Sequence, residues 1–140
     1  FWHKLAKVLC APETQAAFKR KFKDVLEERF GTSIDRLWFY PVPHLVRDLG
    51  GYRIAIHRDA QSKGITVQLY LPRDDKQAHL GTIFHDGPDG EAALRIKQLG
   101  FRPATGYSFP VQLTKSWHSV AATSAGIRPR CQPASSTGSR

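Results

Sequence analysis

Two short stretches decide the expected fold: residues 52–57, Tyr-Arg-Ile-Ala-Ile-His, and residues 64–71, Gly-Ile-Thr-Val-Gln-Leu-Tyr-Leu. Both are rich in β-branched and aromatic residues and are bounded by glycine, proline or aspartate, which is the pattern of short β-strands. Similar stretches occur at residues 37–40, 81–85, 106–111 and 116–121. Several short strands at this spacing predict a mainly β fold, built as a barrel or a double-sheet jelly roll.

Residues 12–30 carry a different pattern, that of an amphipathic helix. Apolar side chains recur there every three or four positions, at Phe18, Phe22, Val25, Leu26 and Phe30. Pro12 suits the first helical turn and Gly31 suits the stop. We expect this N-terminal helix to pack its apolar stripe on one sheet.

The composition is that of one ordinary globular domain, with 140 residues, 41% apolar and 24% charged. The net charge of +9 favours anionic partners, but the basic residues are scattered, as on a solvated surface. No apolar run approaches the roughly 20 residues of a membrane span, so no membrane partner is expected. Two distant cysteines, Cys10 and Cys131, predict neither a disulfide framework nor a zinc site, and a reduced, cytoplasmic chain is expected.

The clearest chemical feature is His57-Arg58-Asp59, at the end of the first long strand stretch. Residues i and i+2 of a strand share a face and lie roughly 6.6 Å apart, so an imidazole and a carboxylate can converge on one ion. The spacing alone is common, and the alternative is a polar strand end that faces water.

A third ligand must come from elsewhere, and the candidates are His79, His85 and His118. His118 stands at the start of a strand stretch. Two histidines and one carboxylate form the facial triad of non-haem iron(II) oxygenases. Zinc accepts the same ligands, so ligand identity alone does not choose the metal.

Arg128 lies ten residues after His118, beyond a turn expected at Ala125-Gly126. A guanidinium has the geometry to bind a carboxylate with two hydrogen bonds, so Arg128 could anchor an acidic cosubstrate. The alternative is an exposed arginine at a strand end.

The order of these motifs resembles the iron(II)/2-oxoglutarate-dependent dioxygenase superfamily: His-x-Asp, a distal histidine, and a basic residue ten positions further on. Three more segments resemble that family's strands and their connections, namely Ile65 to Pro72, Leu80 to Phe84 and Pro103 to Phe109. The resemblance covers about residues 50–128 and is nearest to prolyl-hydroxylase-like members and small bacterial or phage oxygenases.

The resemblance implies a double-stranded β-helix (jelly roll) catalytic core at residues 50–130. Residues 1–49 would form a helical support region, and residues 131–140 a disordered tail. Iron(II) would be held by His57, Asp59 and His118, with 2-oxoglutarate and dioxygen as cosubstrates and ascorbate as an optional reductant. Because the carboxylate ligand is present, the resemblance implies hydroxylation rather than halogenation.

The resemblance also implies cosubstrate contacts. Arg128 would pair with the distal carboxylate of 2-oxoglutarate, and Tyr70 would hydrogen-bond the same group. Thr66, Gln68 and Tyr70 share one face of their strand, so all three are expected to line the barrel interior, with Gln68 as a further contact. For Tyr70 the alternative is an ordinary core aromatic.

One departure from the family pattern concerns the end of the chain. Pro129 disfavours a central strand after Arg128, so the last strand is expected to be missing, and Arg130 competes for the cosubstrate. Residues 86–91 are expected to be a loop, either a lid or a plain turn.

Several functions remain open. The expected substrate is a small molecule or a protein side chain, and a peptide fits equally. The alternatives are a nucleic-acid demethylase of the same superfamily, a non-enzymatic cupin-like binding module, and an inactive fragment.

Overall fold

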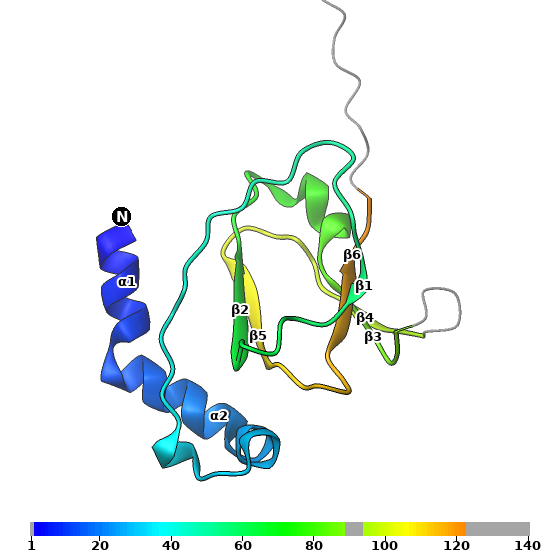
Figure 1. Ribbon diagram of the computed structural model, residues 1–140. Helices are drawn as coiled ribbons and strands as arrows, with labels where there is room; N and C mark the ends of the chain where they lie inside the picture. The colour runs from blue at the N-terminus through cyan, green and yellow to red at the C-terminus, as the bar shows by residue number, and fades with distance from the viewer. Residues whose placement is uncertain (1, 89–93, 123–140) are drawn as a thin grey trace, which may run out of the picture.

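The computed structural model describes residues 2–88 and 94–122, which form two antiparallel sheets and an N-terminal pair of helices (Figure 1). The elements in chain order are α1 Trp2–Cys10, α2 Pro12–Phe30, η1 Ile34–Arg36, β1 Ile54–His57, β2 Ile65–Tyr70, η2 Asp75–Leu80, β3 Ile83–His85, β4 Arg95–Gln98, β5 Thr105–Pro110 and β6 Trp117–Val120. The strands expected from the two opening stretches and from residues 81–85, 106–111 and 116–121 are confirmed to within two residues at each end.

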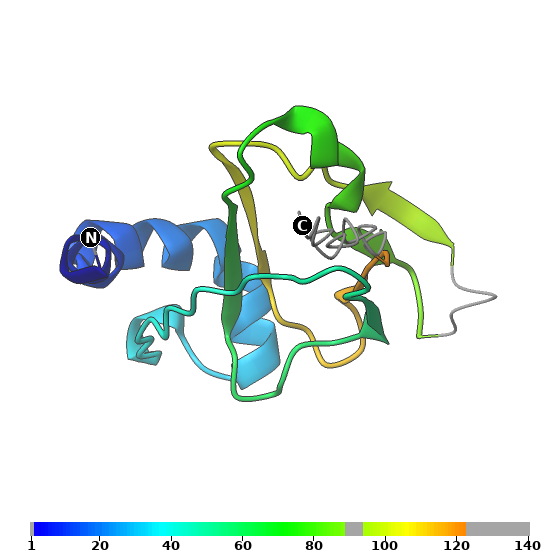
Figure 2. The same cartoon turned by 90° about the horizontal axis from the view of Figure 1, so that it is seen from above.

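The two sheets face one another. One has four strands in the order β1-β6-β3-β4, and the other pairs β2 with β5. Viewed from above, α1 and the start of α2 lie on one side of β2 and β5 and the four-stranded sheet lies on the other, while the end of α2 passes beneath β2 and β5 (Figure 2). Aromatic rings fill the space between the sheets: Phe84 of β3 contacts Tyr107 and Phe109 of β5, with centroids 5.7 and 5.5 Å apart. The core therefore lies between the sheets.

The expected mainly β fold needs correction, because helices of 9 and 19 residues stand beside six short strands. The fold is mixed helix and sheet. Within residues 2–88 and 94–122 no strand pairing joins the two sheets, so the described strands form no closed barrel.

The helix expected at residues 12–30 is confirmed as α2. Pro12 opens it, and Gly31 ends it with a left-handed conformation at φ 61°, which glycine adopts without strain. Leu26 is completely buried, and the helix packs against β5. Ala11 is extended at ψ 135°, as residues before proline prefer, and this separates α2 from the unpredicted α1.

Arg29, near the end of α2, ties the helix to the sheets. Its guanidinium donates hydrogen bonds to three main-chain carbonyls, those of Gln61 at 2.6 Å, Lys63 at 2.7 Å and Val111 at 2.5 Å. Partial burial lowers the pKa of Arg29, but guanidinium groups stay charged in proteins at any ordinary pH. One side chain thus holds the loop that follows β1 and the loop that follows β5.

Replacing Arg29 by methionine is expected to lower the free energy of unfolding by about 2 kcal/mol, because three carbonyls lose a charged donor. Urea denaturation of both proteins measures the difference. The matched control is Arg20→Met, an exposed arginine of the same helix, which should change stability by less than about 0.5 kcal/mol. Equal effects of the two substitutions would show that the three hydrogen bonds contribute nothing.

One predicted strand is wrong. Residues 37–40 form no strand, and Trp38 is 92% exposed. Pro41 and Pro43 follow at once and cannot donate to a ladder, so an extended connection runs here past β2 toward β1 (Figure 1).

Among the described residues, no helix combines the length and the apolar character that crossing a membrane requires.

Candidate metal centre

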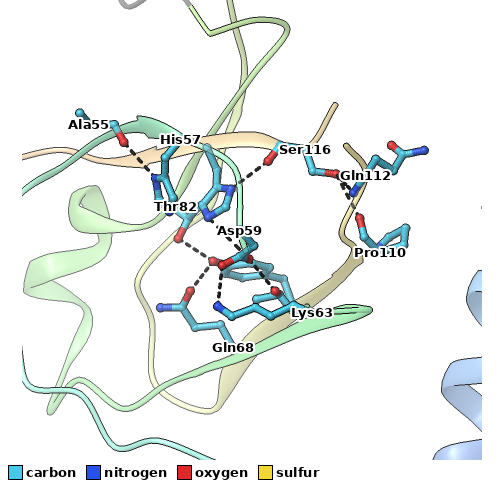
Figure 3. A network of polar contacts seen from close by, with 12 residues as sticks. Ala55, His57, Asp59, Lys63, Gln68, Thr82, Pro110, Gln112 and Ser116 are labelled. Carbon is cyan, nitrogen blue, oxygen red and sulfur yellow. Dashed lines mark hydrogen bonds and ion pairs between the residues drawn. The ribbon is translucent and has the colours of Figure 1, made fainter. Parts of the chain in front are cut away.

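His57 and His118 are brought together by strand pairing. They are direct partners in the β1–β6 register, and their ring centroids lie 4.3 Å apart at an interplanar angle of 52°. Asp59 follows two residues after His57 and places a carboxylate oxygen 4.0 Å from His118 Nε2. One ligand atom from each of the three side chains lies within 4.8 Å of the other two (Figure 3).

Both histidines present the nitrogen that a metal needs. His57 Nδ1 lies 3.0 Å from the carbonyl oxygen of Ala55, and His118 Nδ1 lies 2.9 Å from that of Ser116 (Figure 3). A carbonyl only accepts, so each Nδ1 is the donor, and in the neutral form of either ring the lone pair lies on Nε2. This is the arrangement that orients metal-binding histidines.

Asp59 is held by two donors from the chain that follows it. Lys63 Nζ lies 2.6 Å from Oδ1, and Thr66 Oγ1 donates to Oδ2 at 2.6 Å (Figure 3). Burial works to raise the pKa of Asp59, but the hydrogen bonds from Lys63 and Thr66 outweigh it and the pKa is lowered. The side chain is therefore an anion although it is only 9% exposed.

His118 is buried in the space between the sheets. Burial lowers its pKa, the hydrogen bond to Ser116 opposes this, and the neighbouring His57 lowers it further. The neutral imidazole, which is the form that binds a metal, is thus favoured at neutral pH. Phe109 packs edge-on against this ring at 5.2 Å and shields it from water.

The three ligand types, their free lone pairs and the anionic carboxylate fit a divalent metal with two nitrogen ligands and one oxygen ligand. Metal bonds of roughly 2.1 Å place neighbouring ligand atoms about 3 Å apart, so the group must contract slightly around an ion. Two of the three ligands stand at a strand end or beyond it, where such an adjustment requires no change in the sheet.

Replacing Thr66 by valine is expected to weaken iron(II) binding by about tenfold, because partners that orient a metal ligand typically contribute 10–100-fold in affinity. The change keeps the side-chain shape and removes the donor to Asp59 Oδ2. Anaerobic calorimetric titration measures the effect. Thr105→Val is the control, since that hydroxyl binds the Arg102 carbonyl instead; a loss of similar size there would contradict the assignment.

A second polar cluster lies between the sheets, beside the centre. The Tyr70 hydroxyl donates a hydrogen bond to Thr82 Oγ1 and accepts one from the main-chain N–H of Thr82, both at 2.9 Å. Tyr107 lies 2.8 Å from the same hydroxyl and donates to Gln68. Burial raises the pKa of Tyr107 well above its usual range, so the phenol stays protonated.

The cluster bears on the expected cosubstrate contacts. Thr66, Gln68 and Tyr70 share one face of β2 and bond Asp59, Tyr107 and Thr82, but Gln68 is largely exposed and the described strands enclose no barrel interior for them to line. Tyr70 is 3% exposed and already uses its hydroxyl proton. The sequence did not predict the contacts of Thr82 and Tyr107 with Tyr70 and Gln68, because these contacts form between residues that are distant in the sequence.

The remaining candidates separate clearly. His79 is exposed in η2, and His85 is buried in β3, where its Nε2 lies 2.8 Å from the Ser119 hydroxyl. Neither joins His57 and Asp59 in the described part of the chain. Arg128, Arg130 and the tail at residues 131–140 lie outside the described residues, as do residues 89–91 of the expected loop at 86–91.

Comparisons of this chain with protein-family models, with curated proteins and with solved structures find no match.

Proposed function

We propose that the chain is an iron(II)- and 2-oxoglutarate-dependent dioxygenase that hydroxylates a small molecule or a protein side chain. The observation that carries the proposal is the convergence of His57, Asp59 and His118, with the Nδ1 of each histidine bound to a carbonyl and Nε2 left for a metal. Two facing antiparallel sheets with the centre between them are compatible with a double-stranded β-helix, which is the finer fold assignment that we propose.

The ligand set suits iron(II) because two histidines and one carboxylate occupy one face of an octahedron. Bound iron would supply the dioxygen chemistry. The overall reaction balances as R–H plus 2-oxoglutarate plus O2 giving R–OH, succinate and CO2. One oxygen atom enters succinate and the other enters the product, and the decarboxylation supplies two electrons.

The chain's own residues would divide the work. His57 and His118 would hold the metal with neutral nitrogen donors, and Asp59 would balance part of its charge. Phe84 and Phe109 pack beside His118 and would keep water from that side of the centre. Arg128, Tyr70 and Gln68 are the residues that we propose for binding 2-oxoglutarate; Tyr70 would have to give up its hydrogen bond to Thr82 Oγ1 to do so.

Succinate release from 2-oxoglutarate tests this proposal. The full chain, loaded anaerobically with iron(II) and then exposed to dioxygen, should form succinate, and the zinc-loaded chain should not. Amino acids, peptides, sugars and nucleic acids are then screened for faster turnover. Hydrolysis of a substrate by the zinc form without use of 2-oxoglutarate would instead indicate a hydrolase, and no response to either metal would favour a binding module.

A further inference from the structure

A cleft of about 390 Å³ opens beside the candidate metal centre. It touches both His57 and Asp59, and its other walls come from the loop after β1 and the loop between β5 and β6. This volume is at the small end of ligand pockets, which span roughly 300–1,000 Å³. The cleft therefore has the size for a small molecule rather than for a folded partner.

The walls of the cleft are fixed by main-chain contacts. Arg29 holds the carbonyl of Gln61 in one wall and that of Val111, the residue before Gln112 of the other wall. Ser116 donates to the Pro110 carbonyl at 3.0 Å and lies 3.4 Å from the main-chain nitrogen of Gln112 (Figure 3). Both loops are thus held in place without a ligand.

Arg58 is the only cationic side chain that lines this cleft among the described residues. Its guanidinium lies over the ring of Trp117, 4.4 Å from the centroid. This contact holds the plane of the guanidinium and leaves the N–H groups at its edge to bind a ligand. No acidic side chain in the described part of the chain forms an ion pair with Arg58.

We propose that Arg58 anchors the substrate by its anionic group, and that the substrate is a small molecule with one carboxylate or phosphate. This rests on the proposed function, because the anchored molecule is taken to be what the metal centre oxidises. Arg58 is exposed whereas His57 and Asp59 are partly buried, so the anion would sit near the mouth and the rest of the substrate would point inward. The amides of Gln61 and Gln112 line the same cleft and can bind polar groups along it.

Ligand binding without turnover tests the anchor. The zinc-loaded full chain is titrated with N-acetylglycine, with its neutral amide and with methyl phosphate, and protein NMR shifts give each dissociation constant. One or both anions should bind at least about tenfold tighter than the amide, and Arg58→Gln should remove that preference. The relative affinity of the two anions identifies the preferred group. Arg36→Gln, an exposed arginine in η1, is the control and should change nothing.

A second measurement separates this proposal from the proposed function. With Mn²⁺ in place of iron and 2-oxoglutarate in excess, a bound anion should show paramagnetic relaxation that Arg58→Gln abolishes. Anion binding that does not depend on Arg58, or that depends on it without relaxation by bound Mn²⁺, would overturn the substrate role. Failure of Mn²⁺ to bind at His57, Asp59 and His118 would sink the proposed function and the substrate role with it, whatever the zinc titration shows of Arg58.

Discussion

Replacing Asp59 by alanine is expected to lower succinate formation by about a thousandfold or more. Removing one group that stabilises charge in an enzyme typically lowers the rate by about 100- to 1,000-fold, and Asp59 would also be a metal ligand. Asp59 is the only anionic member of the group, and Lys63 and Thr66 both orient it. Without it, Lys63 would stand uncompensated beside the metal. The two histidines would retain some iron, so binding should fall less than activity does.

Iron(II)-dependent succinate release, measured beside metal content, separates these two effects. The control is Asp24→Ala, an exposed aspartate on α2, which should keep full activity. If Asp59→Ala retained wild-type activity, the carboxylate would have no part in the reaction and the proposed ligand set would be wrong.

The second large effect concerns the cosubstrate. Arg128→Ala is expected to weaken the apparent affinity for 2-oxoglutarate by roughly tenfold to a hundredfold, because a charge-assisted contact contributes about 1.5–3 kcal/mol. Iron binding should hardly change, since the guanidinium would not touch the metal.

Titration of 2-oxoglutarate into the iron(II)-loaded variants Arg128→Ala and Arg130→Ala measures this directly. A large loss in the Arg130 variant alone would move the cosubstrate site by two residues. No loss in either would show that neither arginine binds the distal carboxylate in this chain.

Much of the fold follows from local patterns. The five strand stretches that are rich in β-branched and aromatic residues formed strands, and the stripe through Leu26 formed α2. β4 was not predicted, because Arg95–Gln98 is exposed at all four positions and shows no alternation of buried and exposed side chains. Residues 37–40 were wrongly predicted as a strand because their aromatic composition is that of a strand, while the prolines that follow prevent strand pairing.

The candidate site also combines residues that local patterns predict with contacts that depend on long-range packing. His57 and Asp59 were predicted by spacing within one strand, which is a local property. That His118 pairs directly with His57 depends on the β1–β6 register, and no local pattern specifies a register between strands so distant in sequence. The contacts of Thr82, Tyr107 and Arg29 depend equally on long-range packing, so the sequence alone did not indicate them.

The central claim is that His57, Asp59 and His118 hold one iron(II) ion, and anaerobic equilibrium dialysis with metal analysis tests it most directly. We expect one equivalent of iron per chain, with His57→Ala and His118→Ala each weakening binding by at least about tenfold. His79→Ala removes an exposed histidine outside the group and should bind as the wild type does. Undiminished binding in the first two variants, or a loss confined to the third, would contradict the account.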